Sequence, residues 1–476
     1  MQTEPNLAYL QKNIDRIRDF YNSAPADTTS AGRFYRKLLA NYYRHLIPAT
    51  ASILEVGCGN GGLLSLLPNQ DITGVDVSSR QIELAKKRIP YGKFFCISGE
   101  KLISDLQIQK KFDVIILSET INLGVDVQRI LEQLHHFSTP HTRLILNFYS
   151  SLWRPILTLA TWFGLKSRQP EANWLSNSDT QNLLRLSFWE LIKDQPRILF
   201  PFPFFGLEKI FNKYLAYFLS PLCLTVFHVA RPISKKLPKA QTVSVIIPAR
   251  NEAGNIQAAV ERTPQMGAGT EIIFVEGHST DNTWQEIQRV ARENPQLVIL
   301  QQTDKGKGNA VREGFEKAKG DILMILDADL TVPPEELPKF YALLVSGAAE
   351  FANGVRLVYP MEDKAMRFLN MCANKFFSIA FSWILGQPIK DTLCGTKVLY
   401  KEDYLKISAN RSYFGDFDPF GDFDLLFGAS KLNLKMMDIP IRYRERTYGT
   451  TNIQRWKHGW LLLKMVVFSL RKIKFI

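Results

Sequence analysis

The chain has little cysteine. Its 476 residues include only five, an odd number without paired spacing: Cys58, Cys96, Cys223, Cys372 and Cys394. This pattern argues against a disulfide framework and against a zinc site, and it favours a reducing compartment such as the cytoplasm. The first residues, MQTEPNLAYLQKN, contain an acid at position 4 and no apolar core, so we predict no signal peptide.

The sequence also lacks a run of about 20 apolar residues, the length that a membrane-spanning helix needs. The nearest candidate is the uncharged stretch YLAYFLSPLCLTVFHVA, residues 214–230, which Pro221 interrupts. Two interpretations are open for this stretch: a membrane span, or a core helix that leads into the final strand of a domain. Its short length favours the second.

Acidic residues are scarce relative to basic ones. The 46 acids and 59 bases leave a net charge of +13, which calls for an anionic partner: nucleic acid, a phosphorylated substrate or an acidic membrane. No acid follows Glu445, although seven bases do. The basic residues concentrate in a linker and in the tail, and no nucleic-acid-binding motif accompanies them, so we predict no nucleic-acid partner.

The C-terminal tail and one internal stretch are candidates for apolar surfaces. The tail, HGWLLLKMVVFSLRKIKFI, combines apolar residues with a basic end. This composition is typical of an interfacial helix on an anionic bilayer, and a terminal helix packed on a domain core is the equal alternative. The aromatic stretch RILFPFPFFGLEKIF, residues 197–211, is the second candidate.

Strand and helix patterns alternate in two separate blocks, which predicts two α/β domains with mostly parallel sheets. Expected strands lie at 52–56, 71–77, 93–97, 112–118 and 143–149, and then at 242–252, 270–276, 296–302 and 321–329. Two prolines and four basic residues separate the blocks. We therefore predict a first domain at 1–230, a linker at 231–241, a second domain at 242–455 and a basic amphipathic tail at 456–476.

A glycine-rich turn follows the first expected strand, SILEV. Gly57, Gly59 and Gly61 would let the backbone turn tightly and approach a ligand. About 20 residues later, Asp76 ends the next strand, where a carboxylate can hydrogen-bond to ribose hydroxyls. This pattern by itself allows either a dinucleotide or an adenosine cofactor.

Three segments of this block resemble the class I S-adenosylmethionine-dependent methyltransferases: LEVGCGNG, GVDVSSRQIELAKKR and the long segment that begins FDVIILSETINLG. The resemblance implies a Rossmann-like domain with S-adenosyl-L-methionine as cofactor. It implies that the cofactor is bound by Glu55, Gly57, Gly59, Gly61 and Asp76. The adenine contact would fall on Ser98 or Glu100, and the methyl acceptor would face Ser118 and Glu119.

In the second block, a strand ends on two acids. The segment ILMILDADLTVPPEE, residues 322–336, places Asp327 and Asp329 after a run of five apolar residues, and Pro333 and Pro334 then end the strand. Carboxylate oxygens suit Mg²⁺ or Mn²⁺, and such an ion can hold a diphosphate and stabilise the charge of a leaving nucleotide. The pattern therefore predicts a metal site at Asp327 and Asp329.

Four segments in this block resemble family 2 glycosyltransferases of the GT-A fold: VSVIIPARNE, IIFVEGHSTDNT, DKGKGNAVREGF and LDADLTVPPEEL. The resemblance covers about 243–450 and is to the branch that includes dolichyl-phosphate mannose synthase. It implies a nucleotide-sugar donor bound by Pro248, Arg250, Glu252, Glu276, Lys307, Asp327 and Arg446. Asp329 would bind the metal and act in catalysis. Glu276 stands where the family usually has an aspartate that recognises the base.

The later segments bear on the acceptor. DTLCGTK, residues 391–397, resembles an acceptor-side segment, and Asp422 and Asp424 are candidates for a general base. RERTYGTTN, residues 444–452, resembles a phosphate-gripping segment, in which Asn452 replaces the usual lysine. A phosphate acceptor would need no base because it is already ionised.

Together these features predict a bifunctional enzyme. Its inverting glycosyltransferase would move a sugar from a nucleotide-sugar donor to a glycan or polyprenyl-phosphate-type acceptor. Its methyltransferase would serve the same glycan or glycolipid pathway. We expect a cytoplasmic protein that can lie peripherally on an anionic membrane surface. The alternative is an active glycosyltransferase with a methyltransferase-like domain that only binds.

Overall fold

The computed structural model describes residues 4–23, 30–106, 108–163, 170, 173–233, 240–356, 368–411, 423–444, 446, 448 and 455–475. Contacts divide the chain into two compact units, residues 1–233 with 475–476 and residues 234–474. Three residues singled out in the sequence, Asp422, Gly449 and Asn452, lie outside the described residues.

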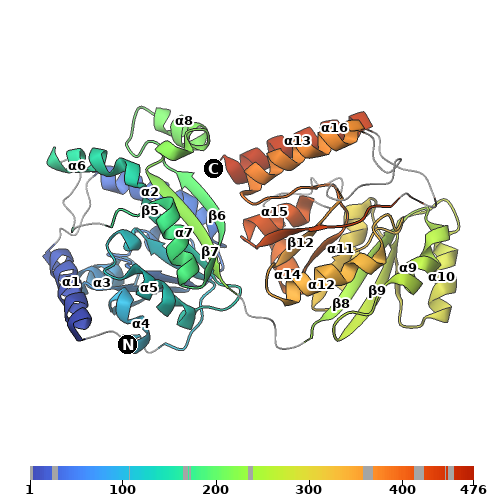
Figure 1. Ribbon diagram of the computed structural model, residues 1–476, viewed down its shortest axis with the longest axis horizontal. Helices are drawn as coiled ribbons and strands as arrows, with labels where there is room; N and C mark the ends of the chain where they lie inside the picture. The colour runs from blue at the N-terminus through green and yellow to red at the C-terminus, as the bar shows by residue number, and fades with distance from the viewer. Residues whose placement is uncertain are drawn as a thin grey trace. The chain divides into compact units, whose positions relative to one another are not determined.

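The first unit contains a seven-stranded sheet in the order β3-β2-β1-β4-β5-β7-β6 (Figure 1). The strands are β1 (Ile53–Val56), β2 (Ile72–Asp76), β3 (Lys93–Cys96), β4 (Val114–Ser118), β5 (Arg143–Tyr149), β6 (Trp189–Arg197) and β7 (Thr225–Pro232). The first five are parallel, and β7 runs antiparallel to β5 and β6. The five predicted strands are confirmed, and β6 is an addition.

Helices cover both faces of this sheet. They are α1 (Glu4–Ser23), α2 (Ser30–Leu46), α3 (Ser79–Arg88), α4 (Leu102–Asp105), α5 (Val127–Leu134), α6 (Arg154–Trp162), α7 (Asn177–Leu186) and α8 (Leu207–Lys213). Ile53 belongs to a buried cluster with Tyr43 of α2, whereas the next residue, Leu54, belongs to a cluster with Leu131 of α5. Successive side chains of a strand point to opposite faces, so a strand covered on both sides is apolar throughout.

The strand order positions a ligand site. Strand β1 pairs with β2 on one side and with β4 on the other. The chain therefore adds β2 and β3 on one side of β1 and then continues the sheet on the other side with β4. In open parallel sheets, a crevice forms at the carboxyl ends of the strands at such a switch point. Gly57, Asp76 and Glu119 follow or end β1, β2 and β4, and they therefore lie around this crevice.

The second unit contains another seven-stranded sheet, in the order β10-β9-β8-β11-β13-β12-β14. Its strands are β8 (Thr242–Ala249), β9 (Gly269–Glu276), β10 (Val298–Gln301), β11 (Ile322–Ile325), β12 (Phe351–Val355), β13 (Lys397–Tyr400) and β14 (Met436–Pro440). Strand β13 runs antiparallel to β11 and β12. The four predicted strands are confirmed, and β12, β13 and β14 make the sheet mixed.

Helices also cover both faces of the second sheet, where two buried clusters form the core. The helices are α9 (Ile256–Arg262), α10 (Thr283–Glu293), α11 (Lys307–Lys317), α12 (Leu337–Val345), α13 (Phe368–Leu385), α14 (Lys401–Ala409), α15 (Phe423–Lys431) and α16 (Arg455–Ser469). Helices α13 and α16 lie against each other (Figure 1).

The tail forms α16 and a final π-helical turn, Leu470–Lys474. Leu462, Met465 and Ile473 are buried in the core of the second unit, so the tail packs as a terminal helix. Other tail side chains face outward, among them Trp460. Packing on the core and an outward apolar face are thus present together.

The stretch 214–230 forms short 3₁₀ turns, Leu215–Tyr217 and Ser220–Leu222, and then strand β7. The predicted final strand is confirmed, but turns take the place of the core helix because Pro221 lies inside the segment. Among the described helices, none has the length and apolar character to cross a bilayer. Strand β7 also includes Arg231 and Pro232, the first two residues of the predicted linker.

Candidate active sites

A cavity of about 710 Å³ opens at the carboxyl ends of the parallel strands in the first unit. Gly57 and Gly59 of the turn after β1, Asp76 at the end of β2 and Glu119 after β4 line it, whereas the predicted Gly61 is not among its lining residues. The structure therefore brings together the residues that the sequence predicted for a nucleoside cofactor.

The glycine turn requires glycine for two different reasons. Gly57, Gly59 and Gly61 have φ values of 77°, 50° and 69°, in the left-handed region that favours glycine. A Cβ at Gly57 would lie 2.6 Å from Oγ1 of Thr120, so packing excludes a side chain there. A Cβ at Gly59 would meet no atom within 4 Å. The backbone at Gly59 is therefore open to a ligand.

Asp76 fixes this turn. Its Oδ2 accepts a hydrogen bond from the Gly59 N–H at 2.9 Å, and its Oδ1 accepts one from the Ser78 N–H at 2.9 Å. Burial raises the pKa of Asp76, although the backbone N–H donors oppose this shift by stabilising the ionised form. One carboxylate thus links the end of β2 to the turn after β1.

Glu55 is buried beneath the turn and lines the cavity. Burial raises its pKa to about 8, against the opposing charge of Arg36. Its Oε2 has no hydrogen-bond partner among the described residues. A buried carboxylate without a partner favours a cationic ligand. S-adenosylmethionine carries a sulfonium and an ammonium group, so the residues present fit this cofactor.

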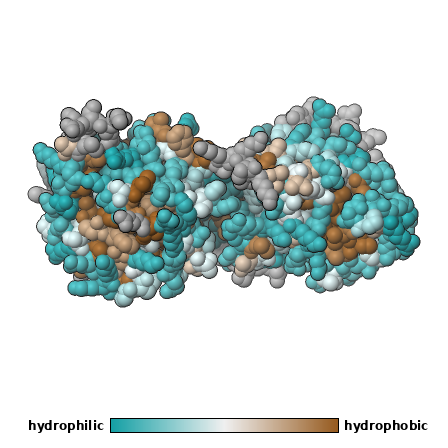
Figure 2. Space-filling view, turned by 90° about the horizontal axis from the view of Figure 1, so that it is seen from below, coloured by the Kyte–Doolittle hydropathy of each residue, from teal (hydrophilic) through white to brown (hydrophobic). Residues whose placement is uncertain are grey.

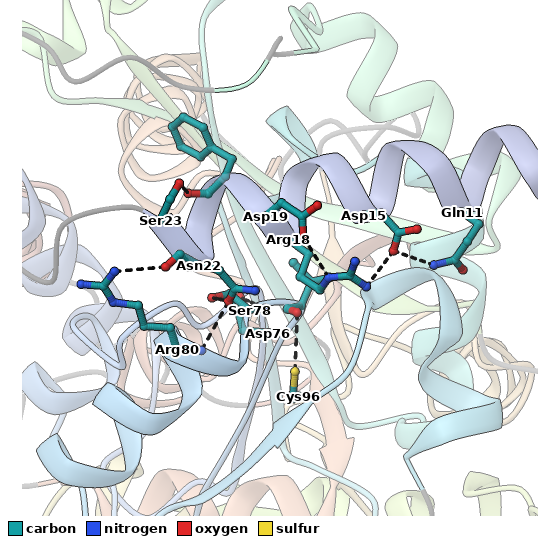
Figure 3. A network of polar contacts seen from close by, with 12 residues as sticks. Gln11, Asp15, Arg18, Asp19, Asn22, Ser23, Asp76, Ser78, Arg80 and Cys96 are labelled. Atoms are coloured by element: carbon teal, nitrogen blue, oxygen red, sulfur yellow. Dashed lines mark hydrogen bonds and ion pairs between the residues drawn. The ribbon is translucent and has the colours of Figure 1, made fainter.

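The end of α1 forms part of the same site, which the sequence did not predict. The side-chain Oδ1 of Asn22 accepts the Ser78 hydroxyl at 2.7 Å, and its backbone oxygen accepts from Arg80 at 3.0 Å (Figure 3). Tyr21 and Phe20 line the cavity. The network ties α1 to the residues that follow Asp76, so α1 covers the cavity.

Ser98 and Glu100, the two candidates for the adenine contact, also line the cavity. The Glu100 carboxylate is buried, and it accepts hydrogen bonds from the Val125 N–H at 2.9 Å and from the Ser98 hydroxyl. Glu100 thus joins the segment after β3 to the segment after β4. The adenine contact itself stays a prediction.

Aromatic side chains surround Glu119, whose φ of 60° is unusual for a residue with a side chain. Tyr35 of α2 and Tyr149 at the end of β5 line the cavity with it. Burial raises the pKa of both phenols well above its usual value, and the charge of Glu119 adds to the shift. Sequence reasoning found Glu119 but missed these tyrosines, which come from distant segments.

In the second unit, both predicted metal ligands are paired with cations. Oδ1 of Asp327 lies 2.6 Å from Nζ of Lys307, at the start of α11. Oδ2 of Asp329 lies 2.5 Å from Nη2 of Arg446. Nη1 of the same arginine lies 3.1 Å from Oε1 of Glu252. The predicted residues thus form two contact groups: Asp327 pairs with Lys307, and Arg446 joins Asp329 to Glu252.

Neighbouring residues fix these two aspartates. Oδ1 of Asp329 accepts the Thr331 hydroxyl at 2.8 Å, a contact that the sequence analysis did not anticipate. A Cβ at Gly395 would lie 2.1 Å from Oδ2 of Asp327. Burial acts to raise the pKa of Asp327, but the charges of Lys307, Lys397 and Arg356 hold it below its usual value. Asp327 is therefore an anion in a cationic environment.

Backbone strain gathers at the same edge of the sheet. Asn251, His278 and Leu330 have φ values of 57°, 55° and 52°, and they follow β8, β9 and β11. Residues held in this region tend to cluster at ligand sites. Their position at three strand ends agrees with a site at this edge.

The remaining nucleotide-side residues lie on β8 and β9. Pro248 pairs in register with Val275, and Arg250 follows the end of β8 with an exposed side chain. Glu276 is buried at the end of β9, and its Oε1 accepts the Ser279 N–H at 2.5 Å. Burial raises the pKa of Glu252 to about 7, against the charge of Arg446.

The candidate acceptor residues have strong partners. Asp391 receives two hydrogen bonds from the Arg356 guanidinium, at 2.7 and 2.9 Å. Asp424 lies 2.9 Å from Nε of Arg411 and 3.2 Å from Nη2 of Arg312. The role of Asp424 as a general base stays a prediction.

The donor set at Asp327 and Asp329 fits a divalent cation in part. Both carboxylates offer the hard oxygen atoms that Mg²⁺ and Mn²⁺ prefer. Within the described ranges, no group of three or more His, Cys, Asp or Glu side chains could hold an ion. The protein would thus provide two carboxylates, and the donor diphosphate would have to complete the coordination.

The fold and these sites define a protein with a methyltransferase-type unit followed by a GT-A-type unit. Residues 48–189 match the family model described as a methyltransferase domain, and residues 244–406 match that of the family 2 glycosyl transferases. The chain belongs to the family 2 glycosyltransferases through its second unit and carries a methyltransferase domain in its first.

Two relatives illustrate the similarity. A dolichol-phosphate mannosyltransferase of Pyrococcus furiosus is 38% identical over 164 residues, which cover 34% of this chain and 46% of that protein. An undecaprenyl-phosphate 4-deoxy-4-formamido-L-arabinose transferase of Proteus mirabilis is 35% identical over 238 residues, which cover 49% of this chain and 67% of that protein. The chain spans about half the length of the first curated relatives it matches, 46% and 54%.

One solved structure similar to the second unit is glucosyl-3-phosphoglycerate synthase from Mycobacterium tuberculosis, in complex with Mn²⁺, uridine diphosphate and glucosyl-3-phosphoglycerate. It is 18% identical, with a TM-score of 0.37, and the match covers 50% of this chain and 81% of that chain.

Proposed function

We propose that the second unit transfers a sugar from a nucleotide-sugar donor to a polyprenyl-phosphate-type or glycan acceptor. The observation that carries this proposal is the pairing of Asp327 with Lys307 and of Asp329 with Arg446 at the strained edge of the sheet. Each of the two aspartates there lies within hydrogen-bond distance of a cation. A diphosphate with its metal offers the complementary pattern of charge.

Each of these residues has a role in the proposed reaction. When bound, Mg²⁺ or Mn²⁺ supplies positive charge that stabilises the leaving nucleotide. Asp327 and Asp329 hold that ion, while Lys307 and Arg446 exchange their carboxylate partners for phosphate oxygens. Pro248, Arg250, Glu252 and Glu276 bind the nucleoside. A phosphate acceptor attacks the anomeric carbon directly, with inversion, and needs no general base.

The acceptor class rests on the relatives and on the surface of the second unit. The names of two relatives specify dolichol phosphate and undecaprenyl phosphate. Helices α13 and α16 expose apolar side chains, among them Phe376, Ile379 and Trp460 at 58%, 65% and 63%. The tail also contains four basic residues, Lys464, Arg471, Lys472 and Lys474. We propose that this face lies peripherally on an anionic membrane, on its cytoplasmic side.

We also propose that the first unit binds S-adenosylmethionine and transfers its methyl group. When bound, this cofactor supplies an electrophilic methyl group. Glu55, the glycine turn and Asp76 hold it, and Glu119 orients the acceptor between Tyr35 and Tyr149. Methyl transfer depends mainly on alignment and on exclusion of water, and the cover that α1 provides serves both.

The test of the glycosyltransferase is nucleotide release by the full chain with Mn²⁺ across UDP-, GDP- and dTDP-sugars, with and without undecaprenyl phosphate. We expect release from one donor, lost in Asp329→Ala. Asp71→Ala, which removes an exposed carboxylate paired with Lys110, is the control and should stay active. The proposal would be contradicted if no donor bound to the protein and no donor released its nucleotide.

A further inference from the structure

Residues 200–222 of the first unit have an inverted pattern of burial. Phe205 is 98% exposed and Phe218 is 71% exposed, whereas the polar residues Glu208 and Asn212 are only 5% and 4% exposed. Folding in water normally buries aromatic side chains and leaves charged ones outside. The segment therefore presents to its surroundings the side chains that a water-facing loop would bury.

Hydrogen bonds explain how the segment keeps this shape. Oε2 of Glu208 accepts the N–H groups of Phe204 and Gly206 at 2.8 and 2.9 Å. The Asn212 amide accepts the Phe200 N–H and donates to the Phe200 carbonyl, both at 2.8 Å. The buried polar side chains thus satisfy the backbone of the segment. Four of its phenylalanines are not required for this and are exposed: Phe202, Phe204, Phe205 and Phe218.

Helix α6 continues the same surface. Trp162 and Phe163 are 83% and 77% exposed. The indole N–H of Trp153, just before α6, donates to the Leu222 carbonyl at 2.8 Å, so the two segments are joined. We name this surface the apolar rim; its exposed members are Leu152, Ile156, Leu159, Trp162, Phe163, Phe202, Phe204, Phe205, Leu207, Ile210, Tyr214, Leu215, Phe218, Leu219 and Leu222.

The exposed charged side chains of the rim are all basic. In residues 151–163 and 200–222, the bases Arg154, Lys209 and Lys213 are all exposed. The only acid in these two ranges is Glu208, which is turned inward against the backbone. Exposed aromatic side chains interleaved with exposed bases complement an apolar medium that has an anionic boundary.

The rim is continuous with the cofactor cavity. Leu157 and Ala160 of α6, Pro201 and Phe202 of the inverted segment, and Leu224 all line that cavity. Figure 1 shows α6 and α8 along the upper side of the first unit. A molecule that covered the rim would therefore meet the entrance of the proposed methyltransferase site.

We propose that the apolar rim docks on the surface of an anionic lipid bilayer, with Trp162, Phe163, Phe205 and Phe218 inserted among the lipids and the three bases at the headgroups. Docking would present the cavity to lipid headgroups, so the methyl acceptor is a lipid-linked molecule. The acceptor class rests on the proposed methyltransferase function, whereas the docking does not.

A local probe tests the docking, because α13 and α16 also expose apolar side chains. An environment-sensitive fluorophore is attached to Phe205→Cys in the full chain, in a background where the exposed Cys96 is serine. Vesicles of phosphatidylcholine with or without phosphatidylglycerol are added. We expect a blue shift and a several-fold rise in emission with anionic vesicles, and little change with neutral ones. The background without the new cysteine corrects for labelling elsewhere.

Ile103→Cys is the matched control, because Ile103 is an exposed apolar residue at 51% that does not belong to the rim. Its label should not shift. No shift at Phe205, or the same shift at both positions, would overturn the docking. Phe205 is almost fully exposed, so its substitution leaves the core intact, and circular dichroism checks this.

Calorimetry with S-adenosylmethionine on the same labelled protein separates this inference from the proposed function. Vesicle insertion without cofactor binding would support the docking and contradict the methyltransferase. Cofactor binding without insertion would overturn the docking alone. A further experiment uses radiolabelled S-adenosylmethionine and vesicles that contain undecaprenyl phosphate, together with the nucleotide-sugar identified as the donor. The vesicles are extracted with organic solvent, and the radiolabel in the organic phase is measured. No transfer would overturn the lipid-linked acceptor.

Discussion

Arg446 and Asp329 form an ion pair with 2.5 Å between Nη2 and Oδ2, at the position predicted for the metal. The same guanidinium contacts Glu252, a predicted nucleotide residue. A single side chain from near the C-terminal tail thus links two parts of the donor site. In the absence of donor, its positive charge balances carboxylates that would otherwise repel each other.

This relationship predicts competition between Arg446 and the metal. In Arg446→Gln, Mn²⁺ should bind more tightly without donor, by at least about fivefold, because an ion pair worth about 1 kcal/mol no longer has to be broken. Electron paramagnetic resonance of free Mn²⁺ measures the affinity directly. Arg262→Gln, which loses a surface pair with Glu335, is the control and should leave the affinity unchanged. Weaker Mn²⁺ binding in Arg446→Gln would contradict the competition.

Glu55 should make stability depend on pH. Burial raises its folded pKa to about 8 from an ordinary 4.5. The folded state therefore holds the proton more tightly, and the stabilisation is full below about 4.5 and is lost as pH rises towards about 8. Thermal unfolding across this range should show a fall in stability that Glu55→Gln lacks. Parallel pH profiles for the two proteins would exclude the effect.

Binding of S-adenosylmethionine should release a proton at neutral pH. A cationic ligand beside Glu55 stabilises the carboxylate and lowers its pKa. Calorimetry in buffers with different ionisation enthalpies would detect the proton, up to one per site. Glu55→Gln should bind without proton release. If the unchanged protein binds the cofactor with no release, Glu55 does not face its charged groups.

Asp76→Asn should weaken cofactor binding. The substitution removes the charge that accepts from Gly59 and Ser78 and that is predicted to accept from ribose hydroxyls. Charged hydrogen bonds contribute about 1.5–3 kcal/mol each, so we expect about 10- to 100-fold weaker binding of S-adenosylhomocysteine. Asp71→Asn is the control for a surface carboxylate. Equal affinity of Asp76→Asn and the unchanged protein would remove Asp76 from the site.

Gly395→Ala should disable the glycosyltransferase without unfolding it. The added Cβ would lie 2.1 Å from Asp327 and 2.5 Å from Lys307, so the two side chains must move. Such overpacking costs about 1–3 kcal/mol, and nucleotide release should fall by at least about tenfold. Gly459→Ala adds the same methyl group where no atom lies within 4 Å, and it should keep full activity. A fully active Gly395→Ala would show that Asp327 tolerates displacement.

Much of the fold followed from local patterns. Apolar runs such as ILMIL predicted the buried parallel strands, because a strand covered on both faces must be apolar throughout. Strands β12, β13 and β14 were missed. Their side chains pack against neighbours that lie far away in the sequence, so no local period marks them. The short strands β13 and β14 have only four and five residues.

The sequence by itself determined which residues could bind a cofactor or a diphosphate, because glycine turns and carboxylates after apolar strands carry their chemistry locally. It placed Glu55, Asp76, Asp327 and Asp329 at strand ends. Only the tertiary structure decided their partners: Arg446 at Asp329, Asn22 beside Ser78 and the tyrosines around Glu119. It also decided that the aromatic segment 200–222 faces outward. These contacts join segments distant in the chain, and long-range packing sets them.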